Sequence, residues 1–235
     1  MSKHQALKSL CDAAERGDVE AAEEALSQGA KINGRVEYGK TPVMFAIQNA
    51  HIPMIRFLKS KGARLNMLDE DQEHPMIYIF TNRGFSVGKD GTETKVGSDR
   101  KMEVLRELLS LGANPNAMGE FGTPALHYAA GHLDGSQVME LIRKGMDVLP
   151  LDELGDATFL HAIVRSDTIS EHDAMLLIGE AVGAGVDVNA KNSNGATAMD
   201  CAKAYEKNLI VEALVAAGAT IEEVAPASKR RMGPR

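Results

Sequence analysis

The sequence lacks several features that would place it in other classes of protein. It has no tryptophan and only two cysteines, Cys11 and Cys201, which lie far apart, so neither a disulfide framework nor a paired-cysteine metal site is expected. No apolar run is long enough for a membrane span or a secretory signal, so we expect a cytoplasmic protein. Acidic residues outnumber Lys and Arg by 33 to 26, and the net charge of -7 argues against a nucleic-acid partner.

One short segment points toward catalysis. Residues 34–41 read GRVEYGKT and match the nucleotide-binding pattern G-x-x-x-x-G-K-[ST] at each fixed position. Such a loop follows a buried strand, whose end directs backbone N–H groups at phosphate. The preceding residues, EEALSQGAKIN, instead have the pattern of a helix and its C-terminal cap. We therefore interpret the match as a coincidence.

The dominant feature is an internal repeat. A five-residue phrase close to G-A-x-x-N recurs, and its copies begin at Gly29, Gly62, Gly112, Gly145, Gly185 and Gly218. The intervals between them are 33, 50, 33, 40 and 33 residues, so a unit of 33 residues carries 17 extra residues once and seven once. The copy at 145–149, GMDVL, lacks the final asparagine.

A second phrase follows each of the first five leading glycines by 12 or 13 residues: TPVMFAI, HPMIYIF, PALHYAA, TFLHAIV and TAMDCAK. Between the phrases run stretches such as MIRFLKSKG and VMELIRKG, whose apolar residues recur at three- and four-residue spacing, as on one helix face. The glycine after each stretch is placed to end a helix in the left-handed conformation. The pattern predicts pairs of short helices joined by turns.

These phrases resemble ankyrin repeats, in which TPLHxAA opens an inner helix and an outer helix ends in G-A-x-x-N before a hairpin finger. The resemblance covers about residues 6–221 and implies an all-α ankyrin-repeat solenoid of stacked helix-turn-helix units with hairpin fingers. It divides the chain into an N-terminal capping repeat at 1–34, repeat 1 at 35–66, repeat 2 at 67–116 with an insertion at about 82–98, repeat 3 at 117–149, repeat 4 at 150–189 with an insertion at about 165–172, repeat 5 at 190–221, and a basic tail at 222–235 that we expect to be disordered.

Inner-helix positions give the first set of candidate binding residues. In the family, the residue after the His position of the inner helix is variable and faces a concave groove. Here that row is Phe45, Tyr78, Tyr128, Ala162 and Cys201. Its three aromatic residues stand out because the chain has only four tyrosines and six phenylalanines. The alternative is that they fill gaps between repeats and extend the core.

The finger tips give the second set, because their side chains should face water. The candidates there are Tyr38, Leu68, Asp71, Met118, Glu120, Phe121, Leu151, Asp152 and Leu154. Exposed apolar surface of this kind marks interaction sites. Together the two sets predict an apolar groove over repeats 1–4 with an acidic rim, suited to a protein partner with apolar and basic surface.

The two large insertions fall between an inner and an outer helix, and therefore at one edge of the solenoid. Phe85 and Val87 are the large apolar residues of the first insertion and make it a candidate second contact surface. Loops tolerate insertions at little cost in stability, so neutral drift is the alternative.

We therefore expect a protein–protein interaction module, monomeric when free, that acts as an inhibitor, immunity protein or adaptor. The sequence has no HExxH motif, and we expect no enzyme activity, cofactor, metal site or membrane contact. The alternative is small-molecule, nucleotide or metal binding, or an enzyme activity. It would lie at the GRVEYGKT loop or at a histidine site, since His127 and His161 are equivalent in adjacent repeats.

Overall fold

The computed structural model describes residues 2–80, 86–87, 93–94, 97–119, 122–151 and 158–220. Its elements in chain order are α1 (Lys3–Arg16), α2 (Val19–Ser27), the 3-10 helix η1 (Glu37–Gly39), α3 (Pro42–Gln48), α4 (Ile52–Ser60), the 3-10 helix η2 (Pro75–Ile79), β1 (Ser86–Val87), β2 (Glu93–Thr94), α5 (Ser98–Ser110), α6 (Ala125–Ala130), α7 (Gly135–Arg143), α8 (Phe159–Arg165), α9 (Glu171–Gly183), α10 (Ala198–Ala204) and α11 (Asn208–Ala216).

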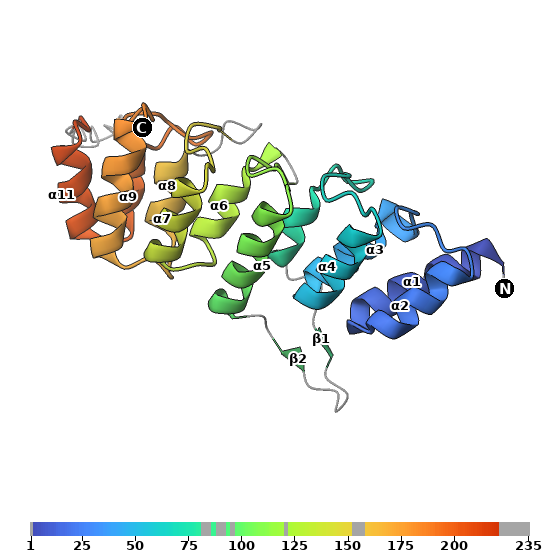
Figure 1. Cartoon of the computed structure of the whole chain (residues 1–235). Coiled ribbons are helices and arrows are strands. Elements are labelled where there is room, and N and C mark those ends of the chain that lie inside the picture. Colours follow the sequence, from blue (N-terminus) through green and yellow to red (C-terminus); the bar gives the residue numbers. More distant parts are fainter. Residues whose placement is uncertain are drawn as a thin grey trace, which may run out of the picture.

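The helices stack in chain order, with α1 and α2 at one end and α11 at the other (Figure 1). The inner elements α1, α3, η2, α6, α8 and α10 each contact the next, and each packs on an outer helix of its own repeat. This is the predicted all-α solenoid. The strands β1 and β2, which pair antiparallel inside the insertion of repeat 2, are an addition that the sequence pattern did not indicate.

Caps at the two ends of the helices explain why the repeated phrases form these elements. At the start of α10, the Thr197 hydroxyl accepts the Asp200 N–H (3.1 Å), and the Asp200 carboxylate accepts the Thr197 N–H (2.8 Å). At the end of α4, Gly62 takes φ = 95°, which lets the Ala63 N–H donate to the Leu58 carbonyl (2.9 Å). The predicted left-handed helix ends are confirmed at all six leading glycines, whose φ angles run from 87° to 103°.

The core lies between the inner and outer helices and runs the length of the stack. Its largest fully buried side chains include Met44, Ile55, Leu58, Met76 and Met102. A narrow core of this kind is continuous only because each repeat covers the apolar face of the one before it. None of the helices that the structure describes is long and apolar enough to span a bilayer.

Asparagine side chains join successive repeats. The Asn33 Oδ1 accepts the Arg64 N–H (2.8 Å) while its Nδ2 donates to the Gly62 carbonyl (3.0 Å), so one side chain satisfies two backbone groups of the next turn. Equivalent bonds at 2.9, 2.9 and 2.8 Å run from Asn114 N–H to Asn66, from Asp147 N–H to Asn116 and from Thr220 N–H to Asn189. These bonds fix how each repeat sits on the next.

The step from repeat 3 to repeat 4 departs from this arrangement. Leu149 occupies the asparagine position and is exposed, and among the described residues no other side chain accepts the Asp187 N–H. Bidentate pairs join the outer helices of earlier repeats, Arg56 to Glu107 (2.7 and 2.8 Å) and Arg106 to Glu140 (2.6 and 2.8 Å). Between α7 and α9 no such pair occurs in the described part of the chain.

Replacing Leu149 with Asn is expected to raise the free energy of unfolding by about 1 kcal/mol, because it restores an acceptor for Asp187 N–H and a donor for the Gly185 carbonyl. The matched change Asn116→Leu should lower it by about 1–2 kcal/mol, since an existing bond of the same kind is lost. Urea unfolding followed by circular dichroism measures both. A Leu149→Asn variant less stable than the wild type would contradict the role given to these bonds.

Repeat 2 opens with His74 instead of the usual threonine, and both ring nitrogens of His74 are used. Nδ1 accepts the Met76 N–H (3.1 Å), so Nε2 carries the proton and donates to the Asn66 Oδ1 (3.0 Å). Burial lowers the pKa of His74 from 6.5 to about 4. Between those values the unfolded chain binds a proton that the folded chain does not, so stability falls as the pH drops from 7 toward 4.

The His74→Thr variant keeps a side chain that can cap η2 but removes this titration. Between pH 7 and pH 5 the wild type should lose about 1–2 kcal/mol more unfolding free energy than the variant does. Urea unfolding at the two pH values gives the loss for each protein. Both proteins have the same carboxylates, so the contribution of these groups drops out when the two losses are subtracted. Equal losses in the two proteins would show that His74 titrates normally.

Candidate functional site

The GRVEYGKT segment is the first hairpin finger, and helix α2 precedes it where a nucleotide-binding loop requires a strand. The Val36 N–H donates to the Lys40 carbonyl (2.9 Å), and Tyr38 takes a left-handed conformation with φ = 60° at the tip. The Lys40 ammonium lies 4.9 Å from the ring centroid of Tyr78 and 5.8 Å from that of Phe45. The lysine of the motif thus makes cation–π contacts with the inner helices.

Four members of the inner-helix row, Phe45, Tyr128, Ala162 and Cys201, are half-buried and pack on the core. The Tyr128 ring stacks on Phe80, with centroids 6.3 Å apart and planes 14° apart. Side chains in this situation combine a packed base with an accessible edge, which suits a binding surface.

Tyr78 is a correction to this row. Its side chain is 1% exposed, and its hydroxyl donates to the carboxylate of Asp69, which also accepts the Glu73 N–H (2.8 Å). Because η2 is a 3-10 helix with three residues per turn, side chains in repeat 2 leave the helix at other angles than in an α-helix. Tyr78 therefore belongs to the core, and its predicted exposure in the groove is wrong.

The finger tips carry apolar side chains in the open. Tyr38 is 67% exposed, Leu68 36%, Met118 37% and Leu151 52%, and Asp71 is also exposed. Backbone bonds hold neighbouring fingers side by side: the Glu70 N–H donates to the Tyr38 carbonyl (3.0 Å), and the His74 N–H donates to the Met118 carbonyl (3.3 Å). We call these five exposed residues the finger-tip surface.

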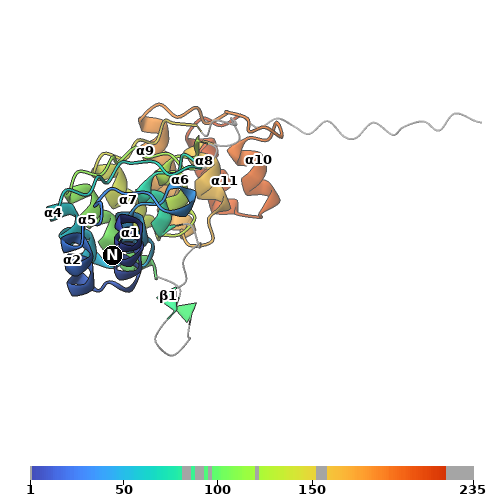
Figure 2. The same ribbon diagram turned by 90° about the vertical axis from the view of Figure 1, so that its right-hand side faces the viewer.

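Several predicted residues lie outside the described part of the chain. They are Phe85, Glu120, Phe121, Asp152 and Leu154, together with the tail at 222–235. Val87 is in β1, but its side chain is not among those described. The strands β1 and β2 lie on the side of the stack opposite the finger loops (Figures 1 and 2), so this second candidate surface is separate from the finger-tip surface.

His161, one of the two histidines of the alternative hypothesis, is hydrogen-bonded within the fold. His161 Nδ1 accepts the Thr158 N–H (3.2 Å), and its Nε2 donates to the Ala196 carbonyl of the next finger (3.1 Å). Within the described ranges no three His, Cys, Asp or Glu side chains converge as metal ligands would. Burial raises the pKa of Cys11 to about 12, which leaves its thiol protonated and unreactive at neutral pH.

Comparisons with known proteins agree with this architecture. Residues 8–85 match a family model described as ankyrin repeats (3 copies), and residues 95–143 match one described as ankyrin repeats (many copies). An ankyrin repeat, SAM and basic leucine zipper domain-containing protein 1 from Dasypus novemcinctus is 30% identical over 118 residues, which are 49% of this chain and 22% of that protein. The chain thus spans about a fifth of the length of such curated relatives.

Two solved structures match almost the whole chain. An ankyrin repeat domain from Acinetobacter baumannii AYE has a TM-score of 0.69 and 26% identity, covering 90% of this chain and 98% of its own. A chain from the complex of a predatory endopeptidase with an immunity protein, from Bdellovibrio bacteriovorus, has a TM-score of 0.68 and 25% identity, covering 89% of this chain and 97% of its own. The chain belongs to the ankyrin-repeat family, whose repeats generally mediate protein–protein interactions.

Truncation should separate the buried tyrosine from an exposed one. Tyr78→Ala is expected to lower the free energy of unfolding by about 3–5 kcal/mol, because it leaves a cavity and strands the Asp69 carboxylate. Tyr38→Ala should change it by less than about 0.5 kcal/mol, because the finger tip has little packing to lose. Denaturant unfolding measures both. A Tyr78→Ala protein with the stability of the wild type would contradict the assignment of Tyr78 to the core.

Proposed function

We propose that this chain binds a partner protein with its finger-tip surface and half-buried inner-helix row, and that it acts by covering the partner's functional surface. The observation that carries the proposal is the exposure of Tyr38, Leu68, Met118 and Leu151 on successive fingers. Apolar side chains exposed to water at these positions do not stabilise the free protein, whereas a complex in which a partner covers them gains the free energy of their burial.

Charge supports one kind of partner. Glu37, Glu70 and Asp71 are exposed on the first two fingers, and the whole chain carries a net charge of -7. A partner with basic residues beside an apolar patch would associate faster and in a preferred orientation, because opposite potentials steer the encounter.

An inhibitory or immunity role is the form of this function that we favour. The likeness to a chain from the complex between an endopeptidase and an immunity protein, which extends over 89% of this chain, supports that form. An inhibitor of this type works by obstruction, so it needs a rigid surface and no chemistry of its own. The backbone bonds between fingers supply such rigidity.

Partner binding can be tested with two variants that remove similar amounts of exposed apolar surface. The first carries Tyr38→Ala, Met118→Ala and Leu151→Ala on the fingers. The control carries Met175→Ala, Leu176→Ala and Leu209→Ala on the outer helices α9 and α11, where the wild-type residues are 41%, 55% and 48% exposed. Both variants should keep the circular dichroism spectrum and stability of the wild type.

The partner is first isolated with the wild type as bait and identified by mass spectrometry, and calorimetry then gives the dissociation constants. Hot-spot truncations each cost about 2 kcal/mol or more in binding, so the finger variant should lose measurable affinity while the control keeps it. An enzyme partner should also lose activity at one equivalent of the wild type. Equal binding by the two variants would refute the finger-tip surface, and a loss in the control alone would place the site on α9 and α11.

A further inference from the structure

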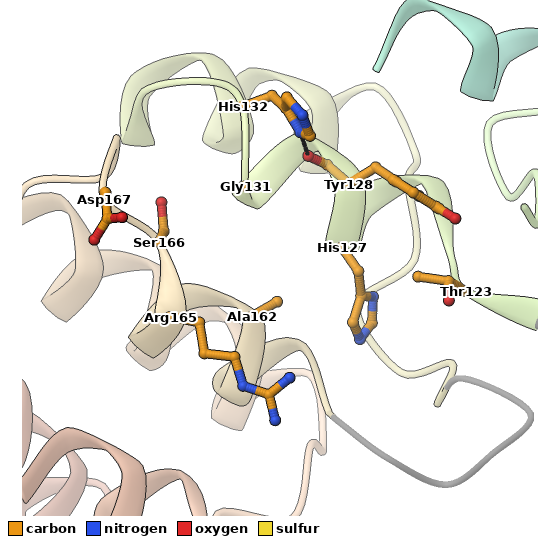
Figure 3. Close-up of a pocket in the computed structure, with 9 residues that line it drawn as sticks. All are labelled: Thr123, His127, Tyr128, Gly131, His132, Ala162, Arg165, Ser166 and Asp167. Atoms are coloured by element: carbon orange, nitrogen blue, oxygen red, sulfur yellow. Dashed lines mark hydrogen bonds between the residues drawn. The ribbon is translucent and has the colours of Figure 1, made fainter. Parts of the chain in front are cut away.

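A pocket of about 410 Å³ opens between the inner helices α6 and α8, on the face that carries the inner-helix row. Its lining includes Tyr128 and Ala162 from the inner-helix row, His127 of α6, and Arg165, Ser166 and Asp167 at the start of the repeat 4 insertion (Figure 3). The volume falls in the range of pockets that hold a ligand or a whole side chain. The pocket joins two features seen separately in the sequence, the inner-helix row and the insertion of repeat 4.

The pocket exists because the inner-helix row changes size at this step. Phe45 and Tyr128 are large, whereas the position after Tyr128 holds Ala162, whose methyl group leaves the space beside α6 unfilled. The Tyr128 ring does not fill it, since it leans toward repeat 2 and stacks on Phe80.

The wall formed by the insertion is held firmly. The Lys207 ammonium, from repeat 5, donates to the carbonyls of Val164 (2.9 Å) and Ser166 (2.6 Å). The Thr168 hydroxyl donates to the Leu133 carbonyl (2.7 Å), which ties the loop to repeat 3. The backbone of Arg165 is thus fixed on both sides, and a group so held binds without a large loss of chain entropy.

Arg165 itself is exposed, and the structure gives its guanidinium no hydrogen bond or ion pair with any described residue. In Figure 3 the guanidinium extends away from Asp167 and toward the side of the pocket where His127 lies. Asp167 therefore does not neutralise it. A planar guanidinium presents paired donors that match the two oxygens of a carboxylate.

We propose that this pocket receives an acidic side chain of the partner protein, whose carboxylate pairs with Arg165 while its methylene groups pack beside Ala162. The inference rests on the proposed function, because the pocket shares Tyr128 and Ala162 with the inner-helix row that the proposed partner covers. The first two fingers carry the acidic residues Glu37, Glu70 and Asp71, whereas the pocket carries the cationic Arg165. This separation of opposite charges along the surface orients the partner.

The probe for this site is a phage-displayed library of random dodecamer peptides, selected on the wild-type chain with counter-selection on Ala162→Phe, in which the pocket is filled. Enriched peptides should share an Asp or Glu flanked by apolar residues. Synthesised with an amidated C-terminus and followed by fluorescence anisotropy, they should bind Arg165→Gln about tenfold more weakly than the wild type. The matched control Arg143→Gln, on the outer helix α7 and away from the pocket, should leave affinity unchanged. Replacing the peptide's acid by its amide should cost nothing further on Arg165→Gln.

Three outcomes would overturn the pocket proposal. Enriched peptides without a shared acid, or with equal affinity for Arg165→Gln, would leave the pocket without its assigned role, and binding that requires a free C-terminus would assign it to a chain end. In these cases the proposed function stands if the finger variant of Tyr38, Met118 and Leu151 binds the peptides more weakly than the wild type does. A library that yields no binder would count against both the pocket and the finger-tip surface.

Discussion

The hydrogen bond from an asparagine side chain to the backbone of the following turn is the interaction on which this structure depends. Asn33 shows its full form, accepting from Arg64 N–H and donating to the Gly62 carbonyl. A helix pair of one repeat is too short to be stable alone, so the fold exists only as a stack. By setting the distance between successive turns, these bonds also set the spacing of the fingers that lead out of those turns, and hence the spacing of the exposed side chains on them.

The candidate binding surface follows from that spacing. Fingers held side by side have little core behind them, so Tyr38 and Leu151 stay in solvent, whereas inner-helix side chains such as Tyr128 are half-covered by the neighbouring repeat. The same neighbour contact creates the pocket beside Ala162, because a small side chain at one step cannot fill the space that aromatic residues fill at others. Surface and core are therefore decided together, at each contact between repeats.

Much of the fold could be predicted from the sequence, because its signals are local and repeated. The leading glycines and the threonine caps act within one turn of helix, and a period of 33 residues shows how often they act. The prediction for Tyr78 failed because η2 winds as a 3-10 helix. The phrase HPMIYIF resembles the phrases that form α-helices in other repeats too closely to reveal this difference. Lys40 and Arg165 were missed for a different reason. The role of Lys40 comes from its distance to the ring of Tyr78, and that of Arg165 from a loop held by residues of repeats 3 and 5. One sequence does not give distances between repeats.

The strands β1 and β2 show where this solenoid can change its length. Asn66 still reaches Asn114 N–H at 2.9 Å, although the interval from Gly62 to Gly112 is 50 residues instead of 33. The two strands lie on the side of the stack opposite the fingers, and the contact between turns is kept across the insertion. The edge that carries the fingers thus keeps its spacing while the opposite edge takes 17 extra residues, so a longer loop at that edge leaves the finger-tip surface unchanged.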